Sequence, residues 1–390
     1  MIVLTIMQYY DKLSDMERYL FAPIKRDLKK KMVILTGPRQ VGKTWLAKAL
    51  MKGYMKPQYL NYDNPADARI VHGQIWPQDA DLLILDEIHK MKNWKRFVKG
   101  VFDTRPKGQA LLITGSSRME TFRQAGESLA GRYFAYRLDP VSVKELQPKV
   151  APREALDRLM RLGGFPEPFL AGSQEEASRW RSQYLTDLVR EDILEFSRIH
   201  EVRAVRLMVE LLRERVGSPL SYTGLAGDLQ IAPNTVRKYV DILESLCIIF
   251  LVRPFHSNIA RAVLKEPKAY FFDTGAVIGD EGARFENACA VCLLKHVHFL
   301  QDTKGSDISL YYVRTRDKRE VDFALGRGKR LAFLLEAKLS ESRPTPGMRY
   351  FHERYPGAAA VQLVKNLRRE ESASGITVAD AAHWLAQLEA

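Results

Sequence analysis

The fold of this chain is decided by the octet Gly37-Pro38-Arg39-Gln40-Val41-Gly42-Lys43-Thr44. It satisfies the pattern GxxxxGK[ST], in which glycines let backbone N–H groups converge on one cavity beside a helix N-terminus. An apolar run, Met32 to Thr36, precedes the octet, and a helical pattern, Trp45 to Met51, follows it. A buried strand, a glycine-containing loop and a helix in this order predict a P-loop that binds ATP.

Within this loop, Lys43 is expected to reach the β and γ phosphates, and the hydroxyl of Thr44 to coordinate Mg²⁺. The remaining loop residues are expected to surround the phosphates, chiefly through backbone N–H groups. ATP and Mg²⁺ are therefore the predicted cofactors. The remaining members of the predicted nucleotide site are Gly37, Pro38, Arg39, Gln40, Val41 and Gly42.

The apolar run Leu82 to Leu85 ends in two acids, Asp86 and Glu87. A carboxylate at the end of a buried strand beside a P-loop predicts a group of the Mg²⁺ shell, which assigns that role to Asp86. Glu87 would then be the general base that polarises the attacking water. The alternative is that a strand simply meets solvent here.

A second strand-like run, Leu111 to Thr114, also ends in hydroxyl residues. Thr114 or Ser116 could hydrogen-bond the γ-phosphate or the lytic water, although an ordinary strand-to-turn step would look the same. Arg132 could stabilise charge in the transition state, with Arg118 as the alternative and a plain surface arginine as the competing interpretation.

Length and composition predict a globular protein of two or three domains, since 390 residues exceed one ordinary core and 46% of them are apolar. Three cysteines cannot form a disulfide framework, which favours a reducing cytoplasm. Cys289 and Cys292 are expected to pack in a core. No apolar run approaches eighteen residues, so no transmembrane helix is expected.

The net charge of +13 is concentrated in residues 1–140, which hold 24 Lys and Arg against 14 Asp and Glu. The basic clusters are Lys25 to Lys31 and Lys90 to Lys99. Such clusters suit a polyanion such as DNA, with solvated surface lysines as the equally simple alternative.

The pattern along the chain predicts an α/β protein with a largely parallel sheet in its first third. One helix is predicted for Arg203 to Val216, and a helix, a short turn and a second helix for Ser221 to Phe250. The apolar run Cys247 to Val252 follows as a strand. This order predicts a winged helix-turn-helix. The last of these helices has an exposed polar start, where DNA contacts are made, formed by Asn234, Thr235, Arg237 and Lys238. Winged helices also serve as protein contacts, which is the alternative. The predicted segments are a P-loop domain (1–145), a helical linker (146–202), the winged helix (203–255) and a further α/β domain (256–390).

The last domain contains Asp322 and, fourteen residues on, Glu336, on strand-like runs joined by a glycine turn. A hairpin would place these carboxylates together as a metal-binding pair. Lys338 lies two residues along the same strand and would share that face, where it could activate water. Glu286, on a preceding helix, could join the metal ligands.

The motifs together resemble prokaryotic AAA-superfamily ATPases that carry a winged helix and a C-terminal restriction-endonuclease-like domain. The resemblance implies an ASCE-type nucleotide fold with its catalytic glutamate at Glu87, and a nuclease-type arrangement at Asp322, Glu336 and Lys338. Trp45 departs from the pattern and is expected to pack under the loop. The segments that carry the resemblance are the octet at 37–44, Leu85 to His89, Thr114 to Ser117, Glu127 to Arg132, Gly163 to Pro166, Tyr270 to Gly275 and Glu320 to Phe323.

The expected function is ATP hydrolysis that controls DNA binding. Metal-dependent cleavage could be an added activity, and the alternative is a degenerate nuclease fold kept for DNA or protein binding. The alternative is a regulatory ATPase of the STAND type, whose downstream modules bind protein partners. A small-molecule kinase is disfavoured because no acceptor-binding lid is evident. Relatives of this kind often assemble, so an oligomer is open.

Overall fold

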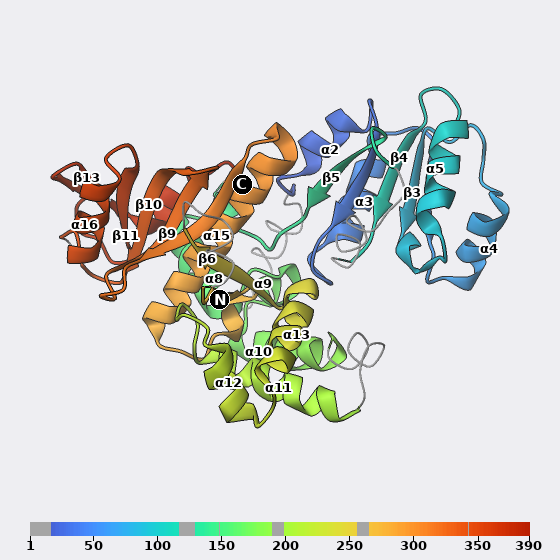
Figure 1. Ribbon diagram of the computed structural model, residues 1–390. Helices are drawn as coiled ribbons and strands as arrows, with labels where there is room; N and C mark the ends of the chain where they lie inside the picture. The colour runs from blue at the N-terminus through green and yellow to red at the C-terminus, as the bar shows by residue number, and fades with distance from the viewer. Residues whose placement is uncertain (1–16, 117–128, 148, 189–198, 256–264, 342) are drawn as a thin grey trace, which may run out of the picture. The chain divides into compact units, whose positions relative to one another are not determined.

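The computed structural model describes residues 17–116, 129–147, 149–188, 199–255, 265–341 and 343–390 (Figure 1). They form two compact units. The first comprises residues 17–139 with 302–304, and the second the described parts of 140–301 and 305–390. The first boundary thus lies before the predicted one after residue 145, and residues 203–255 are not separated from 256–390. Residues Ser117, Arg118, Glu127 and Ser128 lie outside the described part of the chain.

The first unit is built on a five-stranded parallel sheet in the order β2-β3-β4-β1-β5. β1, β3 and β4 are buried at all five of their positions, because a parallel sheet covered on both faces needs continuous apolar strands. The prediction of a parallel sheet is confirmed. The elements are α2 (Phe21–Asp27), β1 (Met32–Thr36), α3 (Lys43–Met51), β2 (Pro57–Asn61), α4 (Pro65–Gly73), β3 (Leu82–Asp86), η1 (Ile88–Lys90), α5 (Trp94–Thr104), β4 (Ala110–Thr114) and β5 (Tyr133–Arg137).

This strand order brings three separate segments of sequence to one edge of the sheet. β4 lies between β1 and β3, with Leu35 paired to Thr114 and Asp86 paired to Thr114 on the other side. The P-loop follows β1, so the loop, Thr114 and Asp86 all lie at the carboxyl ends of neighbouring parallel strands. Ligands of open α/β sheets bind at this edge.

The second unit contains an eight-stranded mixed sheet in the order β12-β13-β11-β10-β9-β8-β6-β7. The 24-residue helix α15 begins at the cap Asp280, whose carboxylate accepts from the Ala283 N–H, and ends at Gly305. Figure 1 shows β9, β10, β11 and β13 of this sheet in orange and red, with α16 beside them. The elements that complete the unit are α7 (Val143–Leu146), α8 (Pro152–Leu162), α9 (Pro166–Ala171), α10 (Gln174–Asp187), α11 (Ile199–Arg213), α12 (Tyr222–Leu229), α13 (Pro233–Ser245), β6 (Ile249–Pro254), β7 (Lys268–Phe271), η3 (Thr274–Ala276), α15 (Glu281–Lys304), β8 (Ile308–Arg314), β9 (Glu320–Arg327), β10 (Arg330–Lys338), α16 (Pro346–Arg354), β11 (Ala359–Val364), β12 (Glu371–Ala373), β13 (Ile376–Asp380) and α17 (Ala381–Leu385).

The helices α11, α12 and α13 lie where the sequence predicts them, and β6 and β7 follow as an antiparallel pair. The expected core stripe of α13 is buried at all four positions: Val236, Tyr239, Val240 and Leu243. β6 also pairs with β8, so the strands after the helices belong to the large sheet. This shared sheet is the physical reason why residues 203–255 do not form a unit of their own.

A buried ion pair joins α10 to the turn after β7. The Arg181 Nε donates to Asp273 Oδ2 at 2.5 Å, and its Nη2 donates to the Leu162 carbonyl at 3.1 Å. Both charged side chains are 8% exposed. A Cβ on Gly163 (φ +85°) would lie 1.8 Å from Asp273 Oδ1, so only glycine fits beside this carboxylate. Two of the motif segments, at Gly163 and at Asp273, therefore meet in one structural junction.

The expectation for the cysteines of α15 is confirmed: Cys289 is 0% and Cys292 2% exposed. None of the helices in the described ranges has the length and apolar character that crossing a membrane requires.

Candidate functional site

The loop after β1 has the backbone of a phosphate cradle. Gly37 has φ +148°, and a Cβ there would lie 2.3 Å from the Leu138 carbonyl oxygen. Gly42, the N-cap of α3, is left-handed with φ +99°. Gln40 is also left-handed at φ +59°, which costs a non-glycine residue about 1–3 kcal/mol. Such strain is typical of ligand-binding loops, and here it turns the loop around the start of α3.

Lys43 lies in the first turn of α3 and is 7% exposed. Its ammonium donates to the carbonyls of Gly37 at 3.0 Å and Pro38 at 2.6 Å. The cation is therefore held against the loop and close to the helix N-terminus, where anions are favoured. This placement agrees with its predicted role toward phosphate.

Asp86, at the end of β3, is 2% exposed and accepts hydrogen bonds from three hydroxyls. Thr44 Oγ1 donates to Asp86 Oδ2 at 2.9 Å, and Tyr59 OH donates to the same oxygen at 2.6 Å. Thr114 Oγ1 donates to Oδ1. Buried carboxylates need such donors, and these three come from α3, β2 and β4.

The residues present fit Mg²⁺. Thr44 Oγ1 and Asp86 Oδ2 are hard oxygen ligands 2.9 Å apart. Two adjacent ligands of an octahedral ion with bonds of 2.0–2.1 Å are separated by about 2.9 Å. Both groups could therefore lie in the shell of one ion.

Glu87 follows Asp86 in a left-handed conformation with φ +55°. Its N–H donates to the Thr114 carbonyl at 3.0 Å, which ties the residue to the end of β4. Burial raises the pKa of Glu87 above its ordinary value, against the opposing charge of Lys43. The side chain is 26% exposed, so a carboxylate beside the loop still has access to solvent.

His89 connects Glu87 to Ser116. Its Nδ1 lies 3.4 Å from Glu87 Oε2, and its Nε2 lies 3.3 Å from Ser116 Oγ. Ser116, predicted as a nucleotide contact, is thus brought into the same cluster. Its neighbour Thr114 contacts Asp86 instead.

The structure does not bring Arg132 to this edge of the sheet. Its carbonyl accepts from the N–H of Met32, the first residue of β1, so Arg132 lies at the amino end of the strands. Its guanidinium forms an exposed double contact with Asp103, at 2.7 and 3.0 Å. Within one chain, Arg132 cannot contact a phosphate in the loop.

The expectation for Trp45 is wrong. Its side chain is 44% exposed. The buried positions of α3 are Lys43, Leu46, Ala47 and Leu50. Position 45 faces away from that stripe, since side chains repeat every 3.6 residues around a helix.

A second cluster of ionisable side chains lies in the second unit. β9 and β10 pair antiparallel with Leu335 opposite Phe323, and the next step of this register puts Glu336 opposite Asp322. Asp322 Oδ2 accepts from the Ala337 N–H at 3.0 Å. Lys338 Nζ lies 3.0 Å from Glu336 Oε1. The hairpin therefore unites the residues that the sequence singles out.

Lys268, which the sequence does not single out, lies in this cluster and is 1% exposed. Its ammonium is 2.5 Å from Glu320 Oε1, 3.3 Å from Glu286 Oε1 and 3.6 Å from Asp322 Oδ1. Glu286, the expected third metal ligand, thus lies in the cluster through its contact with Lys268. Throughout the described residues, no three His, Cys, Asp or Glu side chains are arranged to hold a metal ion.

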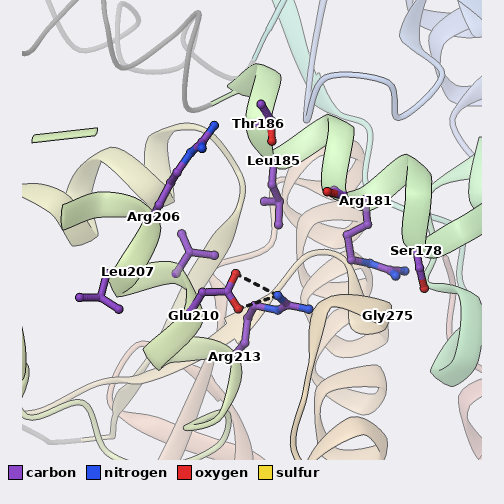
Figure 2. A pocket seen from close by; sticks show the side chains of 11 residues that line it. Ser178, Arg181, Leu185, Thr186, Arg206, Leu207, Glu210, Arg213 and Gly275 are labelled. Atoms are coloured by element: carbon purple, nitrogen blue, oxygen red, sulfur yellow. Dashed lines mark hydrogen bonds and ion pairs between the residues drawn. The ribbon is translucent and has the colours of Figure 1, made fainter. Parts of the chain in front are cut away.

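A pocket of about 590 Å³ lies between α10, α11 and η3. Hydroxyls of Ser178, Ser182 and Thr186 line the α10 wall, and Arg206 comes from α11. Figure 2 shows Glu210 and Arg213, one turn apart on α11, paired with each other, with nitrogen–oxygen distances of 3.0 and 2.7 Å. The walls are polar, and the charges of Glu210 and Arg213 neutralise each other. The pocket is therefore a candidate contact surface, and the sequence does not reveal it.

Three family models match this chain. One is described as an AAA domain and matches residues 29–147. Two are described as domains of unknown function: DUF8612 at residues 153–279 and DUF4143 at residues 281–384.

The relatives are distant. A protein of Mycobacterium tuberculosis is 29% identical over 246 residues, which is 63% of this chain and 54% of the relative. This chain thus spans about half the length of that relative. One of Methanocaldococcus jannaschii is 23% identical over 349 residues, covering 79% of this chain and 76% of that protein. Among solved structures, a Walker-type ATPase of Pyrococcus abyssi superposes with a TM-score of 0.42 and 14% identity, over 66% of this chain and 93% of that one.

The family match coincides with the parallel sheet and with the loop at its carboxyl edge. Most of the first unit therefore matches the model of an AAA domain.

Proposed function

We propose that this chain is a Mg²⁺-dependent ATPase whose hydrolysis controls DNA binding. The observation that carries the ATPase proposal is the contact of Thr44 with Asp86 at 2.9 Å, because it joins the loop to the acidic strand end. Lys43 would neutralise the β and γ phosphates, and Thr44 and Asp86 would hold Mg²⁺. The ion would supply charge neutralisation on the phosphates. Glu87 would accept the proton of the attacking water, and Ser116 would orient the γ-phosphate.

Lys43→Ala is expected to weaken ATP binding about 10- to 100-fold, since a hydrogen bond to a charged group contributes about 1.5–3 kcal/mol. Isothermal titration with Mg²⁺ and ATP measures this. Lys52→Ala is the matched control, because Lys52 caps the same helix and is exposed. If the two variants bind ATP with equal affinity, Lys43 does not contact the phosphates.

The DNA part of the proposal rests on two exposed basic surfaces. α5 and the turn before it present Lys92, Arg96 and Lys99 to solvent. The start of α13 presents Asn234, Arg237 and Lys238. We infer that α12, α13, β6 and β7 act as a winged helix, with α13 directed at the DNA.

Replacing Lys92, Arg96 and Lys99 by glutamine is expected to make the negative slope of log affinity against log salt shallower by up to about 2.7. The reason is that fewer phosphates are contacted, so fewer counterions are released from the DNA on binding. Fluorescence anisotropy with duplex DNA at several salt concentrations measures the slope. The control replaces three exposed arginines elsewhere: Arg343, Arg368 and Arg369. Equal slopes for both triple variants would remove α5 from the DNA-binding surface.

The second candidate is a STAND-like regulatory ATPase with protein partners. The pocket between α10 and α11 favours it, because its mixed polar lining could receive a partner side chain. This candidate takes over if the chain has no affinity for DNA at low salt. In an oligomer, Arg132 could instead contact the phosphates of ATP bound to a neighbouring copy. Metal-dependent cleavage at Asp322, Glu336 and Lys338, expected from the sequence, would need a metal ion beside the Lys268 ammonium, which lies 3.6 Å from Asp322 Oδ1.

A further inference from the structure

The carboxylate cluster of the second unit is organised around a buried ammonium. Lys268 stands at the start of β7, and its Nζ lies within 3.6 Å of oxygens of Glu286, Glu320 and Asp322. These three acids come from α15 and β9, two elements well separated in sequence from β7. The ring of Tyr312 lies below the same ammonium, with the centroid 5.5 Å from Nζ.

The carboxylates have protein donors on their other sides. Tyr270 OH donates to Glu286 Oε1 at 2.6 Å, and the Ala337 N–H donates to Asp322 Oδ2 at 3.0 Å. Arg314 Nη1 donates to Glu320 Oε2 at 2.7 Å. Buried acids require such partners in place of water. Donor groups of the protein therefore take the place of water at these carboxylates.

Charges in the cluster also nearly balance. Four acids (Glu286, Glu320, Asp322, Glu336) face three cations (Lys268, Arg314, Lys338).

Burial alone would lower the pKa of Lys268, but the charges of Glu286, Asp322 and Glu320 outweigh burial and raise it. Burial and the charge of Asp322 raise the pKa of Glu286 to about 7.

We propose that the ammonium of Lys268 is a built-in cation that takes the place of a divalent metal between Glu286 and Asp322. A metal bridging these acids needs oxygens at about 2.0–2.6 Å. An ammonium 3.3 and 3.6 Å from the same oxygens already fills the space between them. The Lys268 ammonium thus meets Asp322 on the side of Glu286, while Lys338 pairs with Glu336.

Two consequences follow for the chemistry. With the Lys268 ammonium between Glu286 and Asp322, a divalent ion has no place there from which to activate water on a phosphodiester. Lys338, the residue expected to assist that water, is held by Glu336 at 3.0 Å. The cluster therefore has no metal-activated water with which to cleave a phosphodiester. This inference is independent of the ATPase proposal, because it concerns other residues and needs no nucleotide.

The test is Mn²⁺ binding to the full chain without nucleotide, followed by electron paramagnetic resonance. The wild type and Asp322→Asn are expected to bind the same amount of Mn²⁺, because no metal sits at Asp322. Lys268→Met is expected to gain one Mn²⁺ per chain, since it keeps the side-chain length and removes the charge. The double variant Lys268→Met/Asp322→Asn is expected to lose this ion again. Lys268→Arg, which keeps the cation, should bind no more than wild type.

One Mn²⁺ bound by the wild type and lost in Asp322→Asn would overturn the proposal, because the lysine would then yield to the metal. A folded Lys268→Met variant, checked by circular dichroism, that gains no Mn²⁺ would also overturn it. If Lys268→Met does not fold, the comparison of Mn²⁺ binding by the wild type and by Asp322→Asn still tests the proposal.

Discussion

Glu87→Gln is expected to bind ATP about as well as the wild type and to lose about 10²- to 10⁴-fold in turnover. Glutamine keeps the size of the side chain and the left-handed backbone at φ +55°, so the loop after β3 is undisturbed. It removes only the carboxylate that accepts a proton from water, and a positioned general base contributes about this factor. Binding by titration and turnover by phosphate release, measured on one preparation, separate the two effects.

The matched control is Glu353→Gln, a change of the same kind at an exposed glutamate of α16. It should leave turnover unchanged. If Glu87→Gln hydrolyses ATP at the wild-type rate, the general base lies elsewhere, and His89 is then the next group to test, because it lies 3.4 Å from Glu87.

Arg181→Met is expected to destabilise the second unit by about 3–5 kcal/mol, which is the usual cost of leaving one partner of a buried ion pair uncompensated. Asp273 is 7% exposed, and Arg181 also donates to the Leu162 carbonyl. The loss of Arg181 therefore removes partners from a carboxylate and a carbonyl at once. Urea unfolding followed by circular dichroism measures the change.

The control for this prediction is Arg179→Met, an exposed position on the same helix. The double variant Arg181→Met/Asp273→Asn should recover part of the stability, because it removes the unpaired charge. Equal unfolding midpoints for Arg181→Met and Arg179→Met would show that the pair does not stabilise the fold.

The first unit could be predicted from local sequence because its signals are local. β1, β3 and β4 are apolar runs that end in polar residues, and the P-loop is contiguous. The order of the strands was not predicted. That order explains why Tyr59 was missed: it reaches Asp86 only because β2 lies beside β3.

The second unit was predicted less completely because its interactions are long-range. Asp322 and Glu336 were found together since a hairpin joins them. Lys268 was not found, because it lies 54 residues before Asp322 (322 − 268) and no motif marks it. Three strands, β11, β12 and β13, were also missed. β12 is exposed at all three positions, so it has no apolar pattern to reveal it.

The central claim is ATP hydrolysis at the loop after β1, and the most direct measurement is steady-state phosphate release by the purified full-length chain. The assay compares Mg²⁺ with EDTA in the wild type and repeats both conditions with Lys43→Ala. We expect phosphate release by the wild type with Mg²⁺ and no release above background with EDTA. Lys43→Ala should release no phosphate above background in either condition. Phosphate release by Lys43→Ala at the wild-type rate, or no release by the wild type with Mg²⁺, would contradict the central claim.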